Sequence, residues 1–254
     1  RLTDNNDHGF TDPENGNGYG YQIWRTPENG FAFNGMGSQY TVFLPDKDLI
    51  FVCTADTQGY KAASSLILTA LYEIISDNLG DKELPEDPVA YNSAMKLGDE
   101  LELYYMTGPT ESPYSKELDG KVWKCKDNPM GITEFSFKFN SDNTGELHYT
   151  NAQGKKVLPF GLGKNVFAKF PHLGYMNEHG GVTTTDGFMY DGAFSASWRE
   201  EKKLLIKIQI IDRYFGAMVA MFSFKDDRAY VIMNKVCEGF MDEYQGSAEA
   251  YLER

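Results

Sequence analysis

Two apolar runs near the start of the chain, Gln39–Leu44 and Leu49–Thr54, flank the polar segment Pro45–Asp48. Proline followed by short polar residues favours a tight reversal, so the pattern predicts a β-hairpin. The segment Asn34–Gln39 precedes the hairpin and holds two glycines, where the backbone can approach a ligand or another strand closely. The pattern therefore predicts a strand, a glycine-spaced turn and a hairpin in succession.

One face of this hairpin needs an apolar cover, and the segment Tyr60–Leu79 can supply it as a helix. Its apolar residues recur at helical spacing, namely Ala63, Ile67, Ala70, Leu71 and Ile74. Upstream, Tyr19–Arg25 and Phe31–Phe33 are predicted strands, joined by the turn-forming residues 26–30. We therefore expect an α+β unit, an antiparallel three-stranded sheet with a C-terminal helix.

A charged, proline-containing segment, residues 80–88, separates two parts of different pattern and marks a domain boundary. We predict one domain at residues 1–86 and a second at residues 87–254. The second begins with a helical stripe of apolar residues, made of Ala90, Ala94, Leu97, Leu101 and Tyr104.

From Asp119 onward the pattern changes to strands. Phe135, Phe137 and Phe139 alternate with polar residues, as in a half-buried strand. Short strands separated by polar turns favour a mainly-β antiparallel barrel or sandwich over alternating β-α units. The other predicted strands are Lys121–Cys125, Glu146–Asn151, Lys156–Phe160, Asn165–Phe170, Phe194–Arg199, Leu204–Asp212, Ala217–Lys225 and Ala229–Val236.

Composition narrows the range of partners. The 254 residues carry a net charge of −13, which argues against nucleic acid or an anionic membrane, because phosphate binding needs clustered lysine and arginine. No apolar run approaches the roughly 20 residues of a membrane span, and no signal peptide opens the chain. The chain begins at Arg1 rather than methionine, so we expect upstream sequence to be missing.

The three cysteines, Cys53, Cys125 and Cys237, form no CxxC pair and make a poor disulfide framework. Cys53 lies in an apolar run and is expected to be a small core residue. The sequence does not decide the cellular compartment.

The segments Tyr19–Trp24, Gly35–Gln39 and Pro45–Val52 together resemble the C-terminal third of the penicillin-recognising serine hydrolases. This family includes class C-type β-lactamases, D-alanyl-D-alanine carboxypeptidases and related esterases and amidases. Its members have a "YGYGW" strand, a strand ending in the third catalytic motif, a "GGQ" turn, a "PxxDLVVV" strand and a closing helix. The resemblance covers residues 17–80, under a third of the chain.

The resemblance implies an acyl-enzyme mechanism for a longer protein, acting on a small peptide, amide or ester. In the family a serine of an SxxK motif is acylated, and backbone N–H groups stabilise the oxyanion. The third motif would fall on Phe33, Asn34 and Gly35, of which only the glycine matches, and Met36 would lie where the oxyanion N–H is offered. Asn34, Gly35 and Met36 are therefore the candidate site residues, and no catalytic set is complete.

The family's upstream motifs have no convincing counterpart in this chain. Ser93–Lys96 is formally an SxxK, Tyr149–Asn151 and Tyr175–Asn177 are formally YxN, and His179–Gly181 mimics an HxG. Their spacings are too short for the family, and they follow its last helix. We therefore expect the chain alone to be inactive.

The second domain resembles the lipocalin-like β-barrel that follows the hydrolase domain in some bacterial members of the family. The resemblance rests on Leu118–Trp123, Asn128–Ile132, Leu158–Gly161 and Glu238–Phe240. It supports an architecture more than an activity, since the function of that barrel is not generally established.

Other residue groups invite a metal or a ligand. His172 and His179 share a glycine-rich segment with Glu178 and Asp186, but a solvated loop explains them better, and we predict no metal and no cofactor. Core packing likewise explains the tryptophans better than a sugar or peptide groove. The segment 174–192 is the favoured binding surface outside the first domain.

Three hypotheses for function follow. The chain is the C-terminal part of a serine hydrolase that lacks its nucleophile, or a non-catalytic β-barrel module that binds a ligand or partner, or a structural buttress. The run Leu49–Thr54 is expected to be an unpaired apolar edge, through which two copies of the chain would associate.

Overall fold

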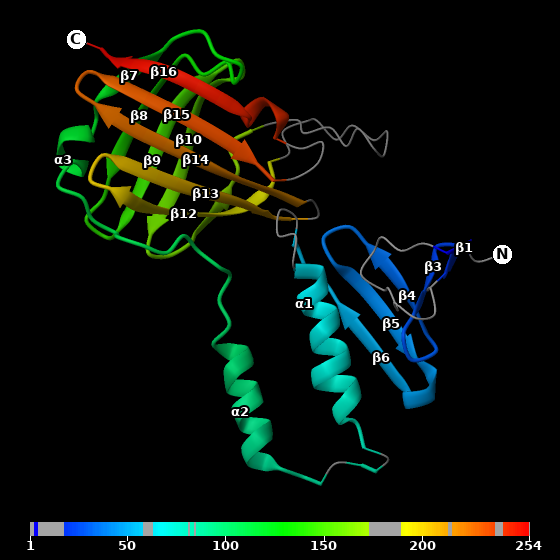
Figure 1. Cartoon of the computed structure of the whole chain (residues 1–254). Coiled ribbons are helices and arrows are strands. Elements are labelled where there is room, and N and C mark those ends of the chain that lie inside the picture. The colour runs from blue at the N-terminus through cyan, green and yellow to red at the C-terminus, as the bar shows by residue number, and fades with distance from the viewer. Residues whose placement is uncertain are drawn as a thin grey trace. The chain divides into compact units, whose positions relative to one another are not determined.

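The computed structural model describes residues 3–4, 18–57, 63–80, 82–83, 85–172, 189–212, 215–236 and 241–253. The chain forms two compact units, residues 1–101 and 102–254, and each unit contains one β-sheet (Figure 1). The structure is thus mainly β, with a separate antiparallel sheet ahead of a barrel, which confirms the architecture in outline. The domain limits at residues 86 and 87 stay a prediction.

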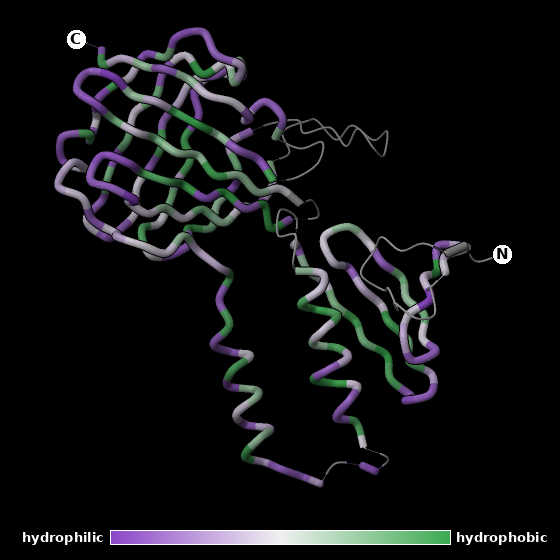
Figure 2. Tube along the Cα trace, in the orientation of Figure 1, coloured by the Kyte–Doolittle hydropathy of each residue, from purple (hydrophilic) through white to green (hydrophobic). Residues whose placement is uncertain are grey.

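The first sheet is antiparallel, with its strands side by side in chain order. It is larger than the three-stranded sheet expected, because short strands near the N-terminus extend it. Figure 2 shows hydrophobic residues along its central strands. Its strands are β1 Thr3–Asp4, β2 Gly18–Gly20, β3 Ile23–Thr26, β4 Gly30–Gly35, β5 Gln39–Leu44 and β6 Leu49–Cys53.

The predicted hairpin is confirmed as β5 and β6, which pair from Leu44↔Leu49 to Tyr40↔Cys53. Residues 45–47 form a single 3₁₀ turn, and Asp48 closes it in the left-handed conformation with a φ of 49°. The expected strand Tyr19–Arg25 is wrong as one element. It is broken into β2 and β3 by a turn at Tyr21 and Gln22, both at positive φ.

The helix that covers the first sheet consists of α1 (Ala63–Thr69), a π-helical segment (Ala70–Ile75) and a 3₁₀ turn (Ser76–Asn78). Leu68 and Leu71 are buried against Ala32, Val42 and Leu44 of the sheet. Ile74 was expected on this face but is exposed. The i→i+5 bonding of a π-helix shifts the phase of the apolar stripe, which moves Ile74 outward.

Polar contacts fix the helix to both ends of the sheet. At one end Lys47 donates to the Ser76 carbonyl at 2.8 Å, and the Ser76 hydroxyl donates to Glu28 at 2.6 Å. At the other end the Ser38 hydroxyl lies 2.6 Å from that of Thr57 and 3.1 Å from that of Ser64. These contacts hold the β4–β5 turn and the β5–β6 turn against the helix.

A second helix, α2 (Pro88–Asp99), follows the linker and begins where Asp87 caps the backbone N–H groups of Val89 and Ala90. None of its residues is buried. The apolar stripe predicted there ends early, because Leu101 and Tyr104 lie beyond the helix, and the Tyr104 ring contacts Lys207, whose Nζ is 4.5 Å from the ring centroid. In the described part of the chain, no helix is long and apolar enough to cross a membrane.

The second unit is a barrel of antiparallel strands, closed by a short parallel contact between β10 and β12. Nine strands complete the circuit, and β11 lies beside β12 outside it. A short helix, α3 (Ser115–Leu118), and a 3₁₀ turn at Asp242–Tyr244 complete the unit. The strands are β7 Val122–Cys125, β8 Glu134–Phe139, β9 Thr144–Asn151, β10 Gly154–Leu162, β11 Val166–Lys169, β12 Asp191–Glu200, β13 Lys203–Ile211, β14 Phe215–Lys225, β15 Arg228–Lys235 and β16 Gly246–Leu252.

Candidate functional site

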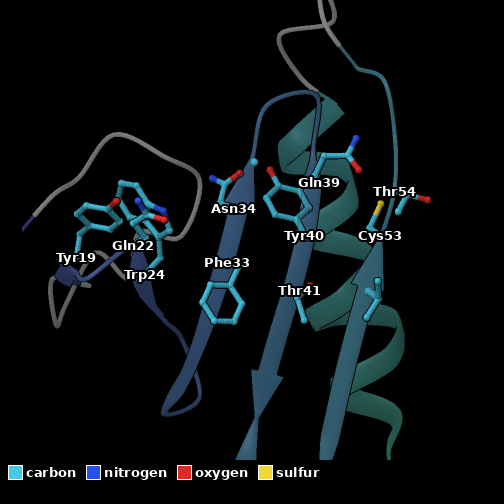
Figure 3. A pocket seen from close by; sticks show the side chains of 12 residues that line it. Tyr19, Gln22, Trp24, Phe33, Asn34, Gln39, Tyr40, Thr41, Cys53 and Thr54 are labelled. Carbon is cyan, nitrogen blue, oxygen red and sulfur yellow. The ribbon is translucent and has the colours of Figure 1, made fainter. Parts of the chain in front are cut away.

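A groove with a volume of about 410 Å³ lies in the first unit. Figure 3 shows Tyr19, Gln22 and Trp24 on one side of it and Cys53 and Thr54 on the other, with β4 and β5 between them. The residues that line it are Tyr19, Gln22, Trp24, Phe33, Asn34, Gly35, Gln39, Tyr40, Thr41, Val52, Cys53 and Thr54. None of these side chains is a carboxylate, an amine or an imidazole.

Strand β4 has an open edge where it borders the groove. It pairs with β3 only through Gly30, Phe31 and Ala32, whereas its last three residues, Phe33–Gly35, pair with β5 alone. Along a strand, successive residues direct their N–H and C=O groups to alternate edges. Among Phe33–Gly35, at least one residue therefore directs both groups toward the groove, where no described strand meets them.

The walls of the groove combine aromatic rings with side-chain amides. The rings of Tyr19 and Trp24 lie 4.2 Å apart between centroids. The amide of Gln39 donates to the carbonyl of Ala55, which ties the start of β5 to the segment after β6. Amides can donate and accept at once, and aromatic rings offer apolar area with few rotamers. This lining suits an uncharged, hydrogen-bonding ligand.

The structure places two of the three predicted site residues in the groove. Asn34 and Gly35 line it, together with Phe33, while Met36 is exposed in the adjoining turn and is not part of the lining. The sequence did not identify Tyr19 or Gln22 as site residues; they reach the groove from β2 and from the turn that follows it. The described lining residues include one thiol, Cys53, and the hydroxyls of tyrosines and threonines. They include no histidine, lysine or carboxylate that could act as a base for any of these groups.

The formal catalytic motifs elsewhere do not form a site. Lys96 lies on the exposed helix α2, where its ammonium group forms an ion pair with Glu100 at 3.6 Å. Tyr149 is buried in the barrel, and its hydroxyl bonds that of Tyr244 at 2.9 Å. The segments Tyr175–Asn177 and His179–Gly181 lie outside the described residues.

The interior of the barrel is filled with side chains. Phe137 packs against five other phenylalanine rings, with centroids 5.0 Å to 6.4 Å away. Trp123 and Trp198 are buried in the same core, which confirms the predicted core packing of these two tryptophans. One hollow in this core, lined by Phe135, Leu147 and Phe222 among others, has a volume of about 10 Å³, enough for one water molecule.

A polar cluster lies at one end of this core. His172 is hydrogen-bonded through Nδ1 to the Tyr244 hydroxyl at 3.0 Å, and its Nε2 lies 2.9 Å from the Glu243 carboxylate. Asn151 donates to the same hydroxyl at 3.4 Å. Burial holds the pKa values of Tyr149 and Tyr244 well above the usual range of tyrosine, so both hydroxyls stay protonated. The cluster satisfies buried polar groups and leaves Tyr244 inaccessible to a substrate.

Of the residues that suggested a metal, only His172 lies in the described part of the chain. His172 bonds Glu243 and Tyr244, whereas Glu178, His179 and Asp186 lie outside the described residues. His148 contacts Glu146 at 2.8 Å on the surface of β9. Within the described ranges, no three histidine, cysteine or acidic residues gather as metal ligands would. The segment 174–192 is described only from Met189 onward, so its role as a binding surface stays a prediction.

Comparison with known proteins gives fold-level likeness only. No family model and no curated protein matches the sequence. A fatty-acid-binding protein from Manduca sexta matches 54% of this chain over 99% of its own length, with 10% identity and a TM-score of 0.33. One from Drosophila melanogaster brain has 12% identity over 54% of this chain and 99% of its own, with a TM-score of 0.34.

The REP1-NXSQ fatty acid transporter matches 54% of this chain over 95% of its own length, with 9% identity and a TM-score of 0.34. Likeness this weak carries no argument about the ligand of this chain. The comparisons also give no support to the resemblance between residues 17–80 and the penicillin-recognising hydrolases, which stays a prediction.

Proposed function

We propose that the chain is a non-catalytic β-barrel module that binds an extended, uncharged peptide or similar amide in the groove of its first unit. One observation carries the proposal: Phe33–Gly35 form a strand edge that no described strand pairs with, beside a hollow of about 410 Å³. Small-ligand sites commonly measure about 300–1,000 Å³. An extended peptide can add to such an edge through backbone hydrogen bonds, while side-chain pockets supply specificity.

The barrel serves in this proposal as a rigid support. Barrels of similar strand number hold a ligand only where the interior leaves room for one. The hollow lined by Phe135, Leu147 and Phe222 among others measures about 10 Å³, far below the volume of any organic ligand. The packed aromatic rings around it favour binding at the groove over binding inside the barrel.

The test uses the whole chain, labelled with ¹⁵N, and the blocked pentapeptide acetyl-Val-Thr-Val-Thr-Val-amide as the probe. We expect saturable NMR shifts at the amides of Phe33, Asn34 and Gly35. Phe33 is half-exposed in the groove, so Phe33→Ala should weaken binding about fivefold, the equivalent of about 1 kcal/mol of lost apolar contact. Phe31→Ala, on the same strand outside the groove, should leave binding unchanged. Shifts confined to the barrel, or none at millimolar peptide, would refute the proposal.

A second candidate is the C-terminal part of a serine hydrolase, in which the groove would border an acyl site completed by residues outside this sequence. The observation in its favour is the order of β4, the glycine turn, the β5–β6 hairpin and the covering helix, which matches the order the resemblance implies. This candidate predicts that the present chain forms no adduct with a fluorescent penicillin or a fluorophosphonate. A covalent adduct on the chain would overturn both candidates as stated.

A further inference from the structure

Strand β6 is the outermost strand of the first sheet and pairs only with β5 among the described strands. Its other edge offers the N–H and C=O groups of a five-residue strand, and an exposed edge of this kind is a template for a further strand. Ile50 and Val52 point away from the covering helix and are 62% and 63% exposed. Pairing along β6 would therefore bury both backbone polar groups and apolar side chains.

Strand β6 is longer and less protected than β1 and β11, the other outermost strands of the two described sheets. Strand β1, at the far side of the same sheet, has two residues, and β11 has four residues and carries an ion pair between Lys169 and Asp191. In the barrel, β10 closes onto β12 only through Gly161 and Leu162, and the rest of β10 carries two lysines and a proline, which discourage edge pairing. Strand β6 contains no lysine, proline, charged residue or bulge, which are the usual devices that prevent edge pairing.

The sequence of β6 matches a second copy of itself. In the antiparallel register that pairs all five residues, Phe51 lies on the two-fold axis and Ile50 faces the partner's Val52. Leu49 then faces the partner's Cys53 on the other face, so every cross-strand pair is apolar. The net charge of −13 opposes association of two copies, but β6 carries no charge and so adds no like-charge pair at the contact.

We propose that two copies of this chain associate through antiparallel pairing of β6 with the partner's β6, which joins their sheets into one. Five residues from each chain bury less than the roughly 1,200 Å² of a stable interface. The dimer is therefore weak, with a dissociation constant on the order of 10–100 µM. Its affinity rises with salt, because salt screens the repulsion between the two acidic chains.

Sedimentation equilibrium of the full chain at concentrations from about 1 to 200 µM tests the proposal. We expect Ile50→Lys to weaken the dimer at least tenfold. Leu66→Lys serves as the matched control, because Leu66 is 67% exposed on α1 and outside β6, so the same added charge should leave the dimer intact. A monomer throughout this range, or a dimer indifferent to Ile50→Lys, would overturn the proposal.

Disulfide crosslinking tests the register, in a chain whose three native cysteines are replaced by serine. The double variant Ile50→Cys with Val52→Cys should form a covalent dimer under mild oxidation, because these positions face one another across the axis. The single variant Ile50→Cys should not, because its two copies lie diagonally, about 8 Å apart at Cα, beyond the reach of a disulfide. Equal crosslinking of the single and double variants would refute this register, and with it the self-matching argument.

Discussion

Replacing Phe137 with alanine should destabilise the barrel by about 4 kcal/mol. The side chain is 1% exposed and lies at the centre of the aromatic core. Its ring contacts those of Phe135, Phe160 and Phe222, among others, at centroid distances of 5.9 Å, 6.4 Å and 5.0 Å. The substitution tests whether the interior is a fixed packing of rings or a space that a ligand could occupy.

The magnitude follows from the packing. Phe→Ala substitutions in cores cost about 3–5 kcal/mol, which includes lost burial and the cavity left behind. Five ring contacts, each worth about 0.5–1.5 kcal/mol beyond burial, place Phe137 in the upper half of this range, although such terms do not add fully. With a urea dependence of about 2 kcal/mol per molar, the unfolding midpoint should fall by about 2 M.

Urea unfolding followed by tryptophan fluorescence measures the effect. Trp123 and Trp198 are both buried in the barrel, so a Trp24→Phe background makes the signal specific to that unit. Phe167→Ala is the matched control, because Phe167 is 62% exposed on β11 and its loss should change stability by less than about 0.5 kcal/mol.

Two results would refute the reasoning. A destabilisation below about 1 kcal/mol for Phe137→Ala would mean that the ring is loosely held and that the interior can open. Binding of benzene to the unmodified chain would mean the same, since a core without space cannot accept it. We expect benzene to bind only the variant, because an apolar cavity of this kind stays dry and takes up small hydrocarbons.

Two further predictions concern ionisable groups of the barrel. A hydrogen bond from Lys124, and a weaker one from Thr150, lowers the pKa of Glu134 below its ordinary 4.5. The ionised carboxylate therefore stabilises the fold above pH 4.5, and this contribution is lost as the pH falls through the lowered pKa. Glu134→Gln should flatten the fall in the urea midpoint below about pH 4.5, and an unchanged slope would contradict the assignment. Burial raises the pKa of Cys125 from 9.0 to about 11, so its thiolate at pH 8 should be about 100-fold scarcer and iodoacetamide should label it correspondingly slowly, with unfolded chain as the control. Equal rates in folded and unfolded chain would contradict that pKa.

Strong local patterns made much of the fold predictable. Alternation at Phe135, Phe137 and Phe139 identified β8, and the segment Pro45–Asp48 identified the turn between β5 and β6. In both places the local preference and the tertiary packing agree. Strand β16, in contrast, has no such signal, because its residues, Gly246–Leu252, include glycine, two alanines and a glutamate. Its pairing with β15 and β7 makes it a strand, and β7 lies more than a hundred residues earlier in the sequence.

The candidate site was predictable only along one strand. Asn34, Gly35 and Met36 were singled out through the resemblance of this strand to a third catalytic motif, and the first two line the groove. The opposite wall includes Tyr19 and Gln22, and their placement depends on a turn in which Tyr21 and Gln22 both have positive φ. Neither residue type favours positive φ, so the sequence does not signal this turn. The bond between Tyr149 and Tyr244 joins residues 95 positions apart, and no short-range pattern reports such a contact.

The place of β16 also bears on how the barrel is made during translation. Strand β16 lies between β7, the first strand of the barrel, and β15, so it joins two halves that are otherwise unconnected along this seam. It is synthesised after all the other strands of the circuit. Until residues 246–252 leave the ribosome, β7–β10 and β12–β15 therefore expose apolar surface that β16 later covers. We expect holdase chaperones to bind the nascent chain during this time.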